Sequence, residues 1–218
     1  MFVQKAGMHY STTEEQDDTD WKYHFESTYY IRYNVKKALY ALDRLEALAK
    51  EAEPDVFVCH VYLDLLLEAC GMLRKWFTPV VDEKRMTANR RSQYKKNQNE
   101  YGYGDDSYPV MCNVYKIRNF VEHIDERDDR LIEGKTYHGT FNVIYAGMDT
   151  SMRDGLSDEN KPQNNLLDLE TMTYKAFEQT NDGPRIISVN LQDLGKELMR
   201  IHQKANQQWN RIELEQRL

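Results

Sequence analysis

The chain has 218 residues, of which 40% are hydrophobic and 30% charged, an ordinary globular composition in a chain long enough to bury a core as one domain. Its net charge of −7 excludes nucleic-acid binding through the overall field of the protein, so such binding would require a local basic patch. No apolar run approaches the roughly 18 residues of a membrane span, and residues 1–20 lack the pattern of a signal peptide. We therefore expect a cytoplasmic protein that does not associate with a membrane.

The chain contains three cysteines, Cys59, Cys70 and Cys112, an odd number with no two close in sequence. Two of them fall in strongly apolar stretches, which favours buried, reduced thiols over disulfides. The histidines and cysteines show none of the spacings that are typical of zinc ligands. We therefore expect neither a bound metal nor a cofactor.

Residues 1–19 should form a flexible segment, because they include a polar run at 11–18. A first helix is expected at about 20–52, where Thr19 or Asp20 can cap the start and Pro54 ends the pattern. Its apolar residues recur at alternating spacings of four and three, which places them on one face of the helix. They are Ile31, Val35, Ala38, Leu42, Leu45 and Ala49.

A second helix should start near Pro54 and end near Phe77. It is apolar on nearly every side, which is typical of a helix that is buried all round. The apolar residues are Val56, Phe57, Val61, Leu63, Leu65, Leu66, Leu67, Met72 and Leu73. Charged residues such as Asp64 and Glu68 favour a core helix over a membrane span. We expect His60 to be a core histidine that hydrogen-bonds a neighbour.

Residues 78–108 are predicted to form an insertion in the helical bundle. Thr78-Pro79 ends the preceding helix, and a turn-rich loop with two Tyr-Gly pairs occupies about 97–109. Between them, residues 84–96 contain no acidic side chain and no apolar stripe, although their composition favours a helix. Such a run either forms a solvated face or contacts phosphate groups. The candidate nucleic-acid-binding residues are Lys84, Arg85, Arg90, Arg91, Lys95 and Lys96.

A third helix is predicted at about 109–133, with Gly134 as its C-cap. Its apolar stripe should face the first two helices and consists of Val110, Val114, Ile117, Val121, Ile124 and Leu131. Because each residue advances a helix by about 100°, Arg118, Asn119 and His123 lie away from that stripe. The same side carries Met111, Cys112 and Tyr115 one turn earlier, which indicates a second buried surface. It would be covered by the last helix, by a β-hairpin or by a second copy of the chain.

The last part of the chain, 134–218, changes period. Phe141, Val143 and Tyr145 alternate as in a strand, and a polar loop follows at 147–165. Further strands are expected at 167–177 and 185–189, joined by a turn at 181–184, so that 166–189 forms a hairpin. A final helix should run from about 191 to 214, capped by Asn190. The predicted fold is mainly α, a helical bundle with a small antiparallel β element and a C-terminal helix packed on it.

The residue types of Arg118, Asn119 and His123 suit metal-free cleavage of RNA. Histidine can transfer protons near neutral pH, and the planar arginine fork fits phosphate oxygens and stabilises developing negative charge. Asparagine can hold a phosphate or orient the histidine. In this reaction the ribose 2′-hydroxyl attacks the adjacent phosphorus, which leaves a cyclic phosphate and a free 5′-hydroxyl.

The run Arg118-Asn119-Phe120-Val121-Glu122-His123 resembles the signature of the HEPN superfamily, an arginine, a polar residue after it and a histidine about four to six residues beyond the arginine. The resemblance covers about 20–133 and leaves 138–214 unexplained. It implies an HEPN-like helical bundle and a homodimer through the 109–133 helix, with the motif at the interface. In active members it implies a metal-independent endoribonuclease of toxin–antitoxin, phage-defence or RNA-processing systems, with Arg118 and His123 catalytic and Asn119 supporting them. The longer run 118–127 also resembles uncharacterised bacterial proteins of this type.

Two functions stay open from the sequence. The first is a homodimeric ribonuclease in which the 84–96 stretch helps to hold RNA, with an antitoxin or another protein as a further partner. The second is a non-catalytic module for dimerisation or protein interaction. In that second case Arg118 pairs with Glu122 at i,i+4, and His123 lies on a solvated helix face. Acidic neighbours such as Asp125 also bring negative charge to a would-be phosphate site.

Overall fold

The computed structural model describes residues 12–78, 86–104, 106–122, 141–149, 151–152, 165–180 and 183–215. This part of the chain is mainly helical, as predicted, and also contains a four-stranded sheet. The helices are α1 (Thr12–Leu48), α2 (Val56–Phe77), α3 (Ala88–Tyr101), α4 (Pro109–Glu122) and α7 (Leu191–Glu215). The strands are β1 (Phe141–Ile144), β2 (Asn165–Asp168), β3 (Thr173–Thr180) and β4 (Gly183–Asn190).

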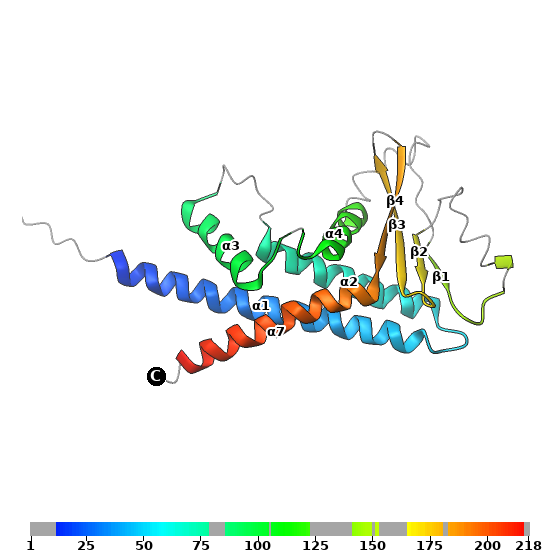
Figure 1. Cartoon of the computed structure of the whole chain (residues 1–218), viewed down its shortest axis with the longest axis horizontal. Coiled ribbons are helices and arrows are strands. Elements are labelled where there is room, and N and C mark those ends of the chain that lie inside the picture. The colour runs from blue at the N-terminus through cyan, green and yellow to red at the C-terminus, as the bar shows by residue number, and fades with distance from the viewer. Residues whose placement is uncertain are drawn as a thin grey trace, which may run out of the picture.

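The helices form an elongated bundle built on the antiparallel pair α1 and α2 (Figure 1). Helix α7 packs along α1 and runs in the opposite direction, while α4 packs on α2. The sheet lies at the end of the bundle where α1 turns into α2, and β3 and β4 contact α4 (Figure 1). One continuous hydrophobic core therefore joins the helices to the sheet.

The apolar stripe predicted for the first helix is confirmed, since Ile31, Val35, Ala38, Leu42 and Leu45 are all buried. The predicted ends of that helix are wrong. Helix α1 begins at Thr12 rather than at Asp20, and it ends at Leu48. The polar run at 12–18 is thus helical rather than loosely attached.

The prediction that helix α2 is buried on every side is wrong. Its start is capped by Asp55, whose side chain accepts hydrogen bonds from the backbone nitrogens of Phe57 (2.8 Å) and Val58 (3.2 Å). Phe57 is 72% exposed, and Val56 and Val61 are exposed as well. This apolar surface lies beside β1, where Val56 also lines a cavity of about 360 Å³. The first turns of α2 therefore belong to the surface, and apolar surfaces of this kind are typical of contact sites.

By length and composition, α2 would also suit a membrane span. Of its most apolar window, 44% is buried inside the chain. Its buried residues, which include Leu63, Leu66 and Leu73, belong to the common core with α1 and α4. Core helices of soluble proteins meet the same criteria of length and composition.

The sheet differs from the predicted antiparallel element in two respects. The expected strand at 167–177 is two strands, because the chain turns at 169–172 between β2 and β3. Asp168 stabilises this turn, since its side chain accepts hydrogen bonds from the nitrogens of Glu170 (2.9 Å) and Thr171 (3.2 Å). The sheet is also mixed, because β1 and β2 pair in parallel while β2–β3 and β3–β4 are antiparallel.

The predicted last helix is confirmed. Strand β4 leads directly into α7, and the side chain of Asn190 accepts a hydrogen bond from the Asp193 nitrogen at 2.9 Å. This is the geometry of an N-cap. The apolar face of α7 is buried at Leu191, Leu194, Leu198, Ile201, Ala205 and Ile212.

Candidate nucleic-acid interface

Helix α3 carries four of the six predicted nucleic-acid-binding residues. Arg90, Arg91, Lys95 and Lys96 all lie on this helix and are exposed, whereas Lys84 and Arg85 lie outside the described residues. The helix starts at Thr87, whose hydroxyl accepts a hydrogen bond from the Arg90 nitrogen, and it ends at Gly102. Gly102 has a φ of +58°, and a Cβ there would lie 2.9 Å from the Lys204 ammonium nitrogen. A residue other than glycine would therefore disturb this helix end.

The inner side of α3 is attached by polar contacts, which explains why its sequence shows no apolar stripe. The side-chain amide of Asn97 donates to the carbonyl oxygen of Trp76 at 3.0 Å, and that of Gln98 donates to the carbonyl oxygen of Phe77 at 2.7 Å. These carbonyls lie at the C-terminal end of α2, where the helix provides no further partner for them. The contacts fix α3 on the bundle with its basic side chains facing solvent.

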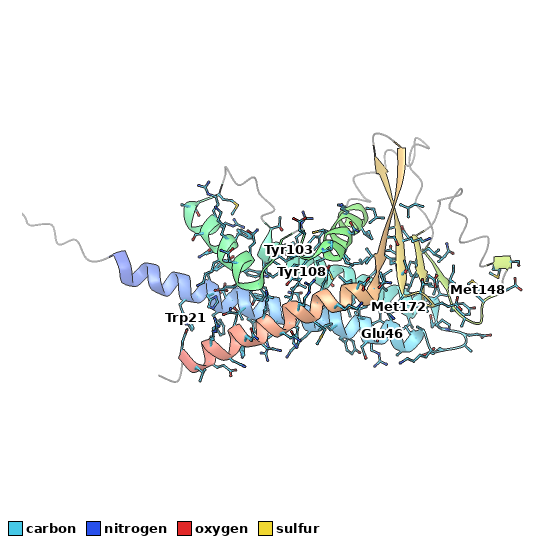
Figure 2. The ribbon with its side chains drawn as sticks, in the orientation of Figure 1. Trp21, Glu46, Tyr103, Tyr108, Met148 and Met172 are labelled. Carbon is cyan, nitrogen blue, oxygen red and sulfur yellow. The ribbon has the colours of Figure 1, made fainter. Side chains whose placement is uncertain are left out.

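The described residues of 102–108 join α3 to α4 as an irregular segment, as predicted, although 97–101 of the predicted loop belong to α3. The tyrosines at 101–108 form a cluster in the core, which was not predicted. Tyr101, Tyr103 and Tyr108 are buried, and Figure 2 shows Tyr103 and Tyr108 together between α3 and α4. The ring of Tyr103 stacks on Phe77 (centroids 4.4 Å apart) and on Tyr108 (5.2 Å). The Tyr108 hydroxyl donates to the carbonyl oxygen of Tyr101 at 2.9 Å. This cluster holds α3 in a fixed position relative to α4.

Two side chains of helix α7 contact residues 101–108 from the outer side of the bundle. The guanidinium group of Arg200 lies over the Tyr108 ring and donates to the carbonyl oxygen of Ser107 at 2.9 Å. The Lys204 ammonium group donates to the carbonyl oxygen of Tyr101 at 2.8 Å. Because both cations donate hydrogen bonds to backbone carbonyl oxygens, they stabilise the fold.

Helix α4 carries the Arg-Asn part of the motif. Arg118 and Asn119 belong to the C-terminal half of α4, but their side chains, and the whole of His123, lie outside the described residues. The predicted stripe is confirmed in the described part, since Val114 and Ile117 are fully buried. The structure therefore places only the backbone of Arg118 and Asn119, on a helix that packs on α2.

The second buried surface that was predicted on α4 exists, and this chain covers it. Met111 and Tyr115 are buried. The Tyr115 hydroxyl lies 3.1 Å from the Tyr103 hydroxyl, and the Arg74 guanidinium carbon lies 4.7 Å from the Tyr115 ring centroid. Burial raises the pKa of Tyr115 well above its ordinary value, so the phenol stays protonated. This chain alone therefore buries Met111 and Tyr115, and no second copy is needed to cover them. Only the Arg118–His123 motif supports the predicted dimer.

The interpretation of His60 as a core histidine is wrong. His60 is exposed, its ring stacks on Phe141 with centroids 4.5 Å apart, and its Nε2 lies 3.5 Å from a carboxylate oxygen of Asp64. The burial pattern of α2 causes this difference, because His60 lies on the same exposed side as Phe57 and Val61.

The chemistry available elsewhere in the described residues is limited. The described residues contain no disulfide. Cys59 and Cys70 are buried, as predicted, and burial raises the pKa of the Cys59 thiol to about 11. Such a thiol is a poor nucleophile at neutral pH. In the described ranges no group of three His, Cys, Asp or Glu side chains could hold a metal ion.

Comparisons with known protein families, with characterised proteins and with solved structures gave no match. The resemblance to the HEPN superfamily therefore rests on the residues of this chain.

Proposed function

We propose that the protein binds single-stranded RNA through α3 and cleaves it without a metal, with Arg118 and His123 as the catalytic residues and Asn119 in support. The observation that carries the proposal is the exposed basic surface of α3, formed by Arg90, Arg91, Lys95 and Lys96, on a helix whose first acidic residue is Glu100. A local surface of this kind can bind a phosphate backbone although the chain is acidic overall. The proposed assembly is an HEPN-like homodimer.

The proposed reaction needs only proton transfer and charge stabilisation. His123 takes the proton of the ribose 2′-hydroxyl, whose oxygen then bonds to the adjacent phosphorus. The 5′-oxygen leaves as its bond to phosphorus breaks. The proton that His123 took is passed to this oxygen through solvent, which gives the 5′-hydroxyl. Arg118 stabilises the extra negative charge on the phosphorus oxygens. The other product is a 2′,3′-cyclic phosphate.

Removing two charges from α3 should weaken RNA binding in a salt-dependent way. For the Arg91→Gln/Lys95→Gln variant, we expect a lower affinity for a fluorescent oligouridylate in anisotropy titrations. The slope of log affinity against log salt should fall by about 1.4, because each phosphate contact on a single strand contributes about 0.7. The control is Lys50→Gln/Lys196→Gln, which removes the same charge from exposed sites in the turn after α1 and on α7. Equal losses in both variants would show that only net charge matters and would refute a binding role for α3.

Catalysis is tested by cleavage in EDTA. We expect the wild-type protein to cut RNA and to leave 2′,3′-cyclic phosphate ends, and Arg118→Ala and His123→Ala each to reduce the rate at least a hundredfold. Both variants should still bind RNA, because α3 is unchanged. Light scattering on the same proteins tests the alternative of a non-catalytic dimerisation module. Intact RNA with the wild type, together with smaller oligomers for both variants, would overturn the nuclease and support that module.

A further inference from the structure

A second cluster of basic and amide side chains lies where α7 crosses α1 (Figure 1). Arg32 and Lys36 are one helical turn apart on α1, and His202 and Asn206 are one turn apart on α7. The Nε of Arg32 donates to the side-chain oxygen of Asn206 at 2.8 Å, and the amide nitrogen of Asn206 lies 3.1 Å from Nε2 of His202. These contacts connect the side chains from two helices into one network.

The cluster holds positive charge that no described carboxylate balances. Neither Arg32 nor Lys36 forms an ion pair with an acidic side chain in the described ranges. Partial burial lowers the pKa of His202, and the charges of Lys36 and Arg32 lower it further. The buried Nδ1 of His202 also has no hydrogen-bond partner among the described residues. An anion at this place would reduce the repulsion among the cations.

Aromatic rings lie next to the cluster, of which Trp209 is half-buried and Tyr29 and Tyr33 are exposed. The Arg32 guanidinium carbon lies 5.2 Å from the centroid of the Trp209 ring, which is itself 6.2 Å from the ring of Tyr29. Tyr29 is 47% exposed and Tyr33 is 55% exposed. Both lie on α1, Tyr29 one turn before Arg32 and Tyr33 one turn before Lys36. Basic side chains next to exposed rings are the combination that binds single strands, because the rings can stack on bases while the cations hold phosphates.

We propose that Arg32, Lys36, His202 and Asn206 form a second RNA-binding site, which takes a phosphate group of a single strand while Tyr29 or Tyr33 stacks on the adjoining base. The choice of RNA over other phosphate compounds rests on the proposed function. The cluster itself is independent of α3 and of the Arg118–His123 motif.

The site predicts a pH dependence through His202. The charged groups that act on His202 are Arg32 and Lys36 of α1, and its hydrogen-bonding neighbour on α7 is Asn206. Because the pKa of His202 is below its ordinary value of 6.5, the ring is neutral at pH 7.5. A bound phosphate raises that pKa, so protonation and binding favour each other. Affinity should therefore increase as the pH falls through the pKa of His202 in the complex and level off below its pKa in the free protein, and His202→Gln should remove this contribution.

The experiment follows the His202 ring signal by NMR during titration with an oligouridylate and, separately, with inorganic phosphate. We expect a saturable shift with the oligonucleotide, a higher pKa of His202 in the complex, and a much weaker response to phosphate alone. Arg32→Met and Lys36→Gln should each weaken this response, Arg32→Met about tenfold. Arg44→Met, a change farther along α1, is the matched control and should have no effect. Because Lys36 is exposed, Lys36→Gln should leave the fold intact and remains informative if Arg32→Met destabilises the chain.

No shift of the His202 signal with either probe would overturn the proposal. An equal response to inorganic phosphate would overturn the assignment to RNA. If the α3 variant loses RNA affinity while His202 does not respond, the second site fails and the proposed function stands. If His202 responds although wild-type protein leaves RNA intact and α3 variants bind normally, the proposed function fails and the site stands.

Discussion

Phe77→Ala should destabilise the protein by about 3–5 kcal/mol, the usual cost of deleting a fully buried aromatic side chain. The Phe77 ring is completely buried at the end of α2, stacked on Tyr103 and in edge contact with Tyr101 (centroids 5.3 Å apart). Alanine would leave a cavity beneath both tyrosines, and neither ring can fill it without moving the segment between α3 and α4. Urea denaturation followed by circular dichroism measures the loss.

The matched control for Phe77→Ala is Phe57→Ala on the same helix. Phe57 is 72% exposed, so its replacement should change the free energy of unfolding by less than about 0.5 kcal/mol. Phe77→Leu keeps most of the volume and should cost less than about 1.5 kcal/mol. A loss below 1 kcal/mol for Phe77→Ala would mean that the tyrosine cluster is not part of the cooperative core. The proposed role of the cluster in positioning α3 would then be wrong.

Residue periodicity correctly predicted which residues are buried in helices that have one apolar face, such as α1 and α7. Ile31, Val35 and Ala38 on α1 are buried at the predicted spacing, as are Leu194 and Leu198 on α7. The prediction failed for α2, because an all-apolar helix contains no information about which side has no neighbour. Phe57 and Val61 are exposed for that reason, and His60 with them. The split between β2 and β3 was missed because the turn consists of Leu169, Glu170, Thr171 and Met172 and contains neither glycine nor proline.

The candidate site was predictable in part. The lack of acidic residues identified α3, since a run of unbalanced charge is visible in sequence and tends to be exposed. The buried tyrosines at 101–108 were missed, because tyrosine and glycine in a polar stretch usually indicate a loop. The cluster of Arg32, His202 and Asn206 was also missed. Its members are separated by more than half of the chain and meet only through the crossing of α1 and α7, which no local pattern encodes.

Glu197→Ala should also destabilise the fold strongly, because a buried carboxylate of α7 caps α4. Glu197 is 4% exposed, and its two oxygens accept hydrogen bonds from the backbone nitrogens of Val110 (3.1 Å) and Met111 (2.8 Å). Nitrogens in the first turn of a helix have no partner within the helix, and the positive end of its dipole favours a negative charge. Removing the side chain leaves both nitrogens unpaired. We expect a loss of about 2–3 kcal/mol in urea denaturation at pH 7.

The ionisation of Glu197 makes its contribution to stability depend on pH. Burial raises the pKa of Glu197 above its ordinary 4.5, although the two backbone hydrogen bonds and Arg200 partly oppose the shift. A raised pKa means that the folded state binds the proton more tightly than the unfolded state. The stability that Glu197 contributes is therefore complete below pH 4.5 and decreases as the pH rises through the folded pKa.

Glu197→Gln should remove that pH dependence and keep one of the two acceptors, so its loss at pH 7 should be smaller than that of Glu197→Ala. The control is Asp193→Ala, one turn earlier on α7, where an exposed carboxylate contacts Lys196 at 2.6 Å. A surface pair of this kind contributes less than about 1 kcal/mol. Similar losses for Asp193→Ala and Glu197→Ala would contradict the cap. If the cap is correct, Glu197→Ala should also slow RNA cleavage, because the helix that carries Arg118 and Asn119 would be held less firmly on the bundle.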